Sequence, residues 1–162
     1  MHPSKEELEM LFVYHEGKLI NLQNRNYNSL IGDHAACLHK KGYFHVKIKG
    51  QSFREHRLIW HMLVGEIPKG KQIDHINGNR NDNRIENLRL VTNRENSQNK
   101  RSAMNTSKTG VLGVSYYKRY NCYVAQICVN YKKINLGYFD NINDAHTAYL
   151  DAKRNFHKTC TI

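Results

Sequence analysis

The sequence predicts an α+β protein made of two small domains. Short alternating apolar runs occur beside segments with helix caps, and a polar stretch precedes a carboxy-terminal block of three β-rich runs and one helix. A length of 162 residues allows one medium domain or two small ones. We expect domains at residues 1–100 and 110–162, joined by a basic linker at residues 101–109.

The amino-terminal part is expected to be a small β-rich and helical scaffold. Ser4 and Glu7 form a capping box, which predicts a short helix through about Phe12. The alternation in Tyr43–Lys49 is typical of a strand in a small hairpin. Apolar residues at helical spacing over Arg54–Leu63 predict a helix there.

A segment rich in Asn, Asp and Arg follows, from Gly65 to Thr92. It ends in Leu88–Val91, where the alternating apolar residues predict a strand. Thr92 and Glu95 form a second capping box. A helix should therefore begin near Asn93.

The carboxy-terminal block contains three β-rich runs separated by short turns: Val111–Arg119, Cys122–Val129 and Lys132–Phe139. Asn141 can cap a helix after them. The predicted apolar face of that helix consists of Ala145, Ala148, Tyr149, Ala152 and Phe156. A three-stranded antiparallel sheet packed on one helix buries these residues most simply, with Tyr149 in the core and Tyr117 exposed.

The charge of the chain points to a polyanionic partner. It has 25 Lys and Arg against 14 Asp and Glu, a formal net charge of +11. No apolar run is long enough for a membrane span, and no signal peptide is evident. We therefore expect double-stranded DNA as the partner and no membrane association.

The four cysteines are scattered, without a Cys-x-x-Cys pair. Zinc-ribbon spacing is absent, and a disulfide framework is not expected in a chain with no export signal. We expect reduced, mostly buried thiols in a cytoplasmic protein.

The residues between Asp74 and Asn96 carry the candidate chemistry. Hydrolysis of a phosphodiester requires an activated water, charge neutralisation at the phosphate, and stabilisation of the leaving 3′ oxygen. In a strand–loop–strand–helix arrangement, Asp74 and Asn96 could offer oxygen ligands to one hard cation. His75 would point the other way and reach the water, and Asn87 could clamp the loop that follows His75.

This segment resembles the HNH nucleases, specifically the Asp-His…Asn…Asn subtype of phage and intron homing endonucleases. The matching pieces are Asp74-His75, Asn87-Leu88-Arg89 and Asn96, and the resemblance covers roughly residues 7–100. It implies a ββα-metal fold in which His75 is the general base, Asp74 and Asn96 hold the metal, and Asn87 orients the loop. Oxygen ligands favour one Mg²⁺ or Mn²⁺ ion per active site over Zn²⁺. The resemblance also suggests a phage-encoded protein acting in the cytoplasm of a bacterial host.

Residues Gly110 to Lys158 resemble the ethylene-response-factor DNA-binding domain of plants. The matching pieces are Gly110–Val114, Tyr123–Ile127, Leu136–Asp140 and the alanines of the final helix. The resemblance implies that the three-stranded sheet enters the major groove. Across the whole chain, the candidate DNA-binding residues are Arg89, Arg94, Lys100, Arg101, Tyr117, Lys118, Arg119, Gln126, Lys132 and Lys133.

Other interpretations of these features remain open. A lone Asp-His pair is usually a loop or strand end without chemistry, and most residues of the Asn-rich stretch 77–83 suit turns. Arg89 and Arg94 also suit an ordinary solvated surface. The chain as a whole could be a DNA-binding regulator on a degenerate nuclease scaffold, or a non-specific phage nuclease. One active site per chain is compatible with a monomer that nicks or a weak dimer that cuts both strands.

Overall fold

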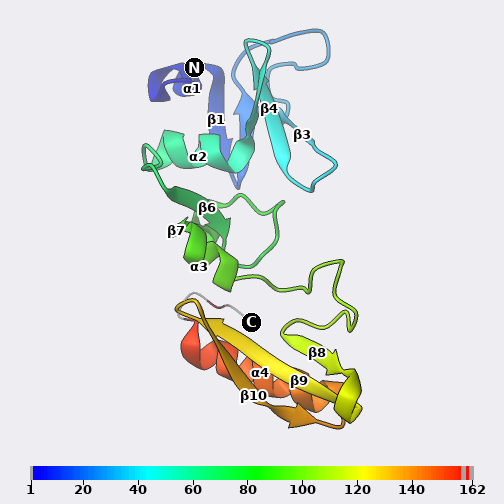
Figure 1. Ribbon diagram of the computed structural model, residues 1–162. Coiled ribbons are helices and arrows are strands. Elements are labelled where there is room, and N and C mark those ends of the chain that lie inside the picture. Colours follow the sequence, from blue (N-terminus) through cyan, green and yellow to red (C-terminus); the bar gives the residue numbers. More distant parts are fainter. Residues whose placement is uncertain (1, 158–159, 161–162) are drawn as a thin grey trace. The chain divides into compact units, whose positions relative to one another are not determined.

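The computed structural model describes residues 2–157 and Cys160 of the chain (Figure 1). The chain divides into two compact units, one ending at Asn93 and the other beginning at Arg94. Both units combine short helices with small antiparallel sheets, which confirms the predicted α+β class. The expected domain limits at residues 100 and 110 stay a prediction.

The first unit begins with helix α1 (Lys5–Leu11), as the capping box predicts. The Ser4 hydroxyl accepts a hydrogen bond from the Glu7 backbone N–H at 3.2 Å and so satisfies one donor of the first turn. The helix ends one residue before the expected Phe12, because Phe12 enters strand β1 (Phe12–His15). Strand β1 forms an antiparallel hairpin with β2 (Lys18–Asn21).

A three-stranded sheet of order β3-β4-β5 follows in the first unit. Its strands are β3 (Ala36–Leu38), β4 (Phe44–Ile48) and β5 (Gln51–Arg54), and β4–β5 confirms the hairpin predicted from the alternation. Helix α2 (Glu55–Leu63) starts directly after β5, within the predicted segment.

Helix α2 holds the first unit together. Figure 1 shows it between the β1–β5 strands and the hairpin of β6 (Lys71–His75) and β7 (Leu88–Thr92). Leu58 and Ile59 on this helix are fully buried, and apolar residues from α1 and the surrounding strands pack against them. The helix thus connects the scaffold to the β6–β7 hairpin that carries the candidate site.

The second unit begins within α3 (Asn93–Gln98), which starts where the second capping box predicts. Its sheet has β9 (Cys122–Val129) in the centre, flanked by β8 (Val114–Tyr117) and β10 (Lys132–Phe139). Two of the three expected runs are confirmed in full. The expectation for Val111–Arg119 was too long, because a turn precedes Val114 and the short 3-10 helix η2 (Lys118–Tyr120) follows Tyr117.

Helix α4 (Ile142–Phe156) covers one face of this sheet. The Asn141 side chain caps it by accepting from the Asn143 N–H at 2.8 Å, and Tyr149 is buried as predicted. The prediction of a buried Phe156 is wrong: its side chain is 48% exposed, because it is the last helical residue. Lys153 is buried instead, and its ammonium group donates to the backbone carbonyl of Lys100.

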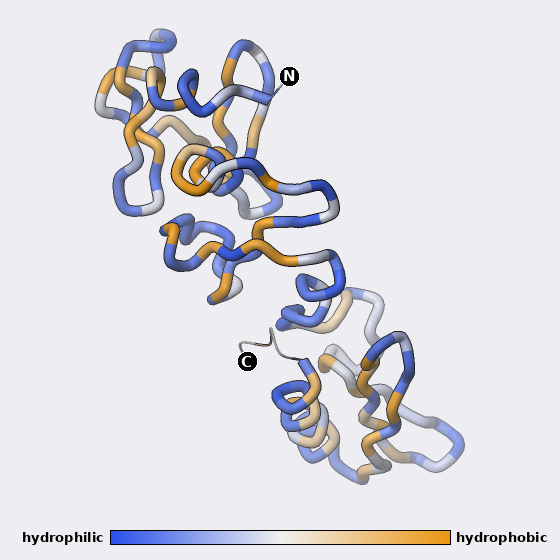
Figure 2. The backbone as a smooth tube through the Cα atoms, turned by 90° about the vertical axis from the view of Figure 1, so that its left-hand side faces the viewer, coloured by the Kyte–Doolittle hydropathy of each residue, from blue (hydrophilic) through white to orange (hydrophobic). Residues whose placement is uncertain are grey.

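All four cysteines are free, but the expectation of mostly buried thiols is wrong. Cys37 and Cys128 point outward from their strands and are exposed, whereas Cys122 is buried. Figure 2 shows short hydrophobic stretches alternating with hydrophilic ones along the backbone. Within the described part of the chain, no helix is long and apolar enough to span a membrane.

Candidate active site

His75 is the last residue of β6, and its side chain is only 4% exposed. The preceding Asp74 is half-buried and lies on the opposite face, because side chains alternate along a strand. Across the hairpin, Asp74 pairs with Arg89 and His75 pairs with Leu88. The hairpin therefore separates the two candidate residues by face, as the sequence suggested.

Asn83 bonds to the His75 ring, and Glu55 in turn bonds to Asn83. The Nε2 atom of His75 lies 3.0 Å from Oδ1 of Asn83, and the Asn83 amide nitrogen donates to Oε2 of Glu55 at 3.0 Å. Glu55 is 0% exposed and Asn83 is 1% exposed. The other Glu55 oxygen accepts from the Leu19 backbone N–H at 2.9 Å and lies 2.7 Å from Nε2 of His34.

The rest of the His75 pocket is aromatic and cationic. The ring of His56 meets His75 edge-on at 4.9 Å between centroids, and the Tyr43 ring lies 6.2 Å away. The guanidinium groups of Arg54 and Arg80 stack on Tyr43, at 4.8 and 4.9 Å from its centroid. Two cations therefore lie on Tyr43, the aromatic neighbour of the candidate base.

Burial keeps both histidines of this pocket neutral. It lowers the pKa of His75 below the usual 6.5, while the hydrogen bond to Asn83 and the charge of Asp74 oppose the shift. Burial, followed by the neighbouring His75, lowers the pKa of His56 to about 3. A neutral His75 can accept a proton at pH 7.

Asn87 closes the loop that follows His75. It is the last residue of the short 3-10 helix η1 (Ile85–Asn87), just before β7. Its side-chain oxygen accepts from the Asn77 N–H at 3.0 Å, and its amide nitrogen donates to the Asp82 carbonyl at 2.7 Å. Its backbone carbonyl accepts from the Ile76 N–H at 2.8 Å. These bonds connect the beginning and the middle of the loop to the residue that precedes β7.

Asp74 is engaged by Arg89, which was expected to contact DNA. The Nε and Nη2 atoms of Arg89 donate to Oδ2 of Asp74 at 3.1 and 2.9 Å. Among the described residues, no cluster of three or more His, Cys, Asp or Glu side chains could hold a metal. A site with one carboxylate still suits Mg²⁺, which proteins often bind through one or two carboxylates together with substrate phosphates and water. The donor types of Asp74 and Asn96 fit such an ion.

Asn96, the second predicted metal ligand, is half-buried on α3. The first unit brings Asp74, His75 and Asn87 together on one hairpin, whereas Asn96 belongs to the second unit. Only three residues of the sequence separate β7 from Asn96. The joint binding of an ion by Asp74 and Asn96 therefore stays a prediction.

All of the predicted DNA-binding residues in the second unit are exposed. Tyr117, Gln126 and Lys133 lie on the face of the sheet opposite α4. Gln126 alternates along β9 with the core residues Ala125 and Ile127, so it points away from the helix. Tyr117 pairs with Cys122 and Lys133 with Cys128, which share the face of Gln126. Lys132 pairs with Val129, which packs on the core, and so lies on the other face. The exposed side chains beyond this face are Lys100, Arg101, Lys118 and Arg119.

Arg94 has a defined place at the start of the second unit. Its guanidinium donates to the Asn130 side chain and stacks on the Tyr131 ring at 5.6 Å from the centroid. Both partners lie in the turn between β9 and β10. These contacts give Arg94 a structural role beside the predicted one in DNA binding.

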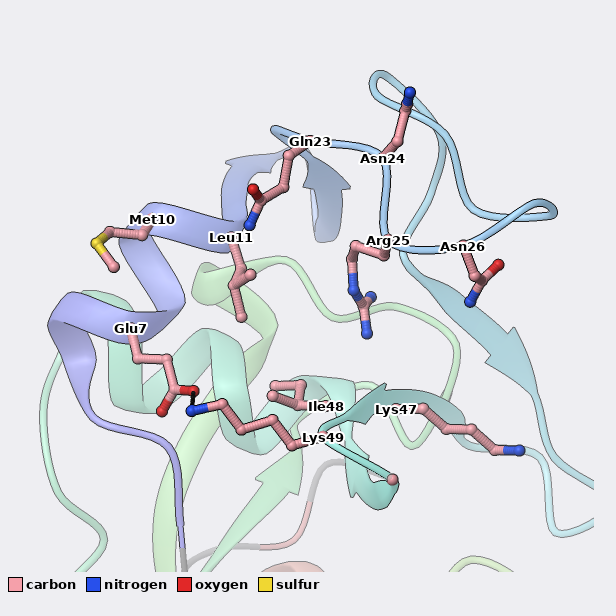
Figure 3. A pocket seen from close by; sticks show the side chains of 11 residues that line it. Glu7, Met10, Leu11, Gln23, Asn24, Arg25, Asn26, Lys47, Ile48 and Lys49 are labelled. Carbon is pink, nitrogen blue, oxygen red and sulfur yellow. Dashed lines mark ion pairs between the residues drawn. The ribbon is translucent and has the colours of Figure 1, made fainter.

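A cavity of about 880 Å³ in the first unit lies apart from these residues (Figure 3). Lys49 reaches Glu7 at 2.6 Å on one side of it, and Arg25 points into it. Arg25 already stacks on Phe12 and donates to Asn21 at 3.4 Å. None of the predicted site residues lines this cavity.

Sequence reasoning missed the groups behind His75. Asn83 was one of several asparagines attributed to turns, and Glu55 was only one residue of the helix predicted over Arg54–Leu63. They lie 28 positions apart in the sequence, so no local spacing links them. A glutamate on the buried face of an apolar helix was the one available signal.

Residues 54–98 match the family model described as HNH endonuclease, so the chain contains an HNH endonuclease domain. This segment includes α2, the β6–β7 hairpin and α3, and with them Glu55, His75, Asn83 and Asn87.

Two curated proteins are similar to parts of the chain. The "SPbeta prophage-derived putative HNH homing endonuclease YosQ" of Bacillus subtilis (strain 168) is 41% identical over 56 residues, 35% of this chain and 32% of that protein. "Protein 3.8" of Escherichia phage T7 is 46% identical over 66 residues, 40% of this chain and 53% of that protein. The chain thus spans about a third of one relative and about half of the other. No solved structure shows significant similarity to it.

Proposed function

We propose that the protein is a metal-dependent DNA endonuclease whose active site surrounds His75. The observation that carries this proposal is a neutral, buried histidine with one ring nitrogen held by Asn83, at the end of a hairpin within the HNH endonuclease domain. A histidine in this state suits a general base, and the match of residues 54–98 to the HNH endonuclease model supports phosphodiester cleavage as the reaction.

His75 takes a proton from the attacking water. The water oxygen forms a bond to phosphorus, and the bond from phosphorus to the 3′ oxygen breaks in line with it. Arg54 and Arg80, which stack on Tyr43 beside His75, neutralise charge on the nearby phosphates. Asn87 keeps the loop after His75 in place through its hydrogen bonds to Asn77 and Asp82.

Asp74 and Asn96 are the residues that would hold one Mg²⁺ or Mn²⁺ ion. When bound, such an ion supplies charge neutralisation at the phosphate and at the departing 3′ oxygen. The ion pair with Arg89, at 2.9 Å, keeps the Asp74 carboxylate oriented. In this proposal Arg89 orients Asp74 in addition to contacting DNA.

The second unit supplies most of the proposed DNA-binding surface. Between Val114 and Phe139 the sequence has four Lys or Arg residues and no acidic residue, which suits contact with phosphates. The outward face of the sheet presents Tyr117, Gln126 and Lys133 from three neighbouring strands. A face of this size fits the major groove, where side chains distinguish base pairs.

We further propose that cleavage is site-directed, as in a homing endonuclease. The name of the Bacillus subtilis relative, a putative HNH homing endonuclease, supports this, and so does the presence of a second, basic unit in the chain. Sequencing the ends cut in a library of random DNA tests it. A shared sequence around the cuts is expected, and cuts without sequence preference would instead indicate a non-specific nuclease.

The experiment that tests the enzymatic proposal is a plasmid-nicking assay with the full chain. Supercoiled DNA should be converted to the relaxed or linear form with Mg²⁺ or Mn²⁺, and EDTA should stop the conversion. Binding without cleavage under either metal would instead support the DNA-binding regulator. Cleavage that persists in EDTA would refute the metal requirement while leaving the nuclease in place.

A further inference from the structure

A buried polar chain begins at a backbone N–H group and ends on the candidate base. Its members are the Leu19 N–H, the Glu55 carboxylate, the Asn83 amide and the His75 ring, joined at 2.9, 3.0 and 3.0 Å. The three side chains of this polar chain are each less than 5% exposed. Water therefore has little access to exchange with these bonds, and each donor must meet an acceptor.

The direction of every bond in the polar chain follows from its first member. The Leu19 backbone N–H can only donate, so the group that faces it must accept. A carboxylate accepts at both oxygens, so the Asn83 amide must donate to Glu55 through its NH₂ group. The Asn83 oxygen then faces His75, and an oxygen can only accept. Nε2 of His75 must therefore carry the hydrogen.

We propose that Glu55 and Asn83 are positioning residues that fix the tautomer of His75, with hydrogen on Nε2 and the lone pair on Nδ1. The inference rests on the proposed function, in which His75 is the base. Proton transfer from water then goes to Nδ1, the nitrogen that the polar chain leaves unprotonated. Neither residue touches the substrate, and both act only through the ring that they orient.

The role of Glu55 in the polar chain differs from ordinary helix stabilisation. Glu55 is the first residue of α2, where an acidic side chain could simply face the helix dipole in solvent. Instead its side chain is fully buried and contacts three separate segments, through Leu19, His34 and Asn83. Burial of a carboxylate is costly unless its oxygens accept hydrogen bonds. The bonds of Glu55 to Leu19 and Asn83 also set the direction of the hydrogen bonds that lead to His75.

Glu55→Gln should reverse the polar chain while changing few atoms. The Leu19 N–H keeps the amide oxygen of Gln on its side, so the new NH₂ group faces Asn83. The Asn83 amide must then turn over and present its own NH₂ group to His75. Nε2 becomes the acceptor, the hydrogen moves to Nδ1, and the lone pair needed for proton transfer is lost. Loss of the correct tautomer costs about 10²–10⁴-fold in rate.

A second substitution should restore the original direction. In Glu55→Gln combined with Asn83→Asp, the new carboxylate accepts from the Gln NH₂ group on one side and from His75 Nε2–H on the other. The double variant should therefore recover the tautomer and at least a tenfold part of the lost cleavage rate. Glu9→Gln, an exposed change on α1, is the matched control. It should alter neither the tautomer of His75 nor the cleavage rate.

The primary readout is the tautomer of His75 in ¹⁵N-labelled full-length protein without DNA or metal. Long-range ¹H–¹⁵N correlation spectra distinguish protonated from unprotonated ring nitrogens, and loss of the signal in His75→Gln assigns it. Wild-type protein and the double variant should show hydrogen on Nε2, and Glu55→Gln should show it on Nδ1. Single-turnover cleavage rates of the same samples form the second readout.

The outcomes separate this proposal from the proposed function. Hydrogen on Nδ1 in the wild-type protein overturns it whether or not the variants fold. An unchanged tautomer in folded Glu55→Gln, or no recovery in the folded double variant, overturns it as well. A tautomer that follows the predicted pattern in a protein that does not cut DNA would support the polar chain and reject the nuclease.

Discussion

Acid should destabilise the first unit because His56 is buried in its neutral form. Its pKa of about 3 in the folded protein lies below the usual 6.5, so the unfolded chain binds a proton between these values that the folded chain excludes. The free energy of unfolding therefore falls as the pH falls through 6.5. The other groups that face this ring, His75, Arg54, Arg57 and His45, all disfavour its protonation further.

The size of the effect follows from the two pKa values. Lowering the pH from 7 to 4.5 should reduce the free energy of unfolding by about 2.5 kcal/mol through His56 alone. This window ends above the folded pKa, so the result depends little on its exact value. Burial also lowers the pKa of His75, which adds to the loss in the same direction.

Trp60 makes the measurement specific to the first unit. It is the only tryptophan of the chain, and it packs against the core from α2. Urea unfolding followed by Trp60 fluorescence at several pH values gives the free energy directly. In His56→Gln, which cannot titrate, the pH dependence should shrink by the amount assigned to His56. Equal slopes for the two proteins would refute the reasoning, even if the variant is less stable throughout.

Three further changes test the packing and the DNA-binding surface. In Gly113→Ala, the new Cβ would lie 2.0 Å from the Tyr149 ring at a φ of +75°. We expect a loss of about 3 kcal/mol or more in the second unit, measured by hydrogen exchange of the β9 amides. Gly110→Ala, at a φ of +66° with nothing within 4 Å, should cost only about 1 kcal/mol; equal losses would contradict the assigned contact. In Gly17→Ala, the Cβ would lie 2.7 Å from the Arg84 backbone nitrogen and 3.0 Å from the Asn83 carbonyl carbon, so cleavage should slow about tenfold. Gly50→Ala, with a φ of +79° and open space, should cut like the wild type. A similar slowing in both variants would show that the contact of Gly17 with Asn83 and Arg84 does not control cleavage. Lys133→Ala should weaken DNA binding and lower the slope of log K against log salt by about one, as followed by fluorescence anisotropy; an unchanged slope would place Lys133 away from phosphate.

Local signals predicted the secondary structure well. The caps at Ser4 and Asn141 stabilise helix starts through bonds to residues two or three positions away, so they are visible in the sequence. Period-two alternation located β4 and β9 for a similar reason. The errors at Phe156 and the exposed cysteines concern burial, which depends on what the rest of the chain covers.

The candidate site was predictable only where its residues are close in sequence. Asp74 and His75 are adjacent, and Asn87 follows within the same hairpin. The polar chain behind His75 joins segments around residues 19, 55 and 83, which no spacing rule connects. The pairing of Arg89 with Asp74 depends on the register of β6 and β7. In a hairpin that register follows from the turn type and loop length, and the long segment between His75 and Leu88 is not a recognisable short turn.

His75 is the residue on which the whole account depends. Single-turnover cleavage of plasmid DNA at saturating protein and Mg²⁺, compared between His75→Ala and wild type, tests it most directly. We predict a rate lower by about 10²–10⁴-fold with unchanged DNA affinity, while His15→Ala, an exposed histidine in β1, cuts normally. Equal cleavage rates for His75→Ala and the wild-type protein would contradict the assignment of His75 as the base.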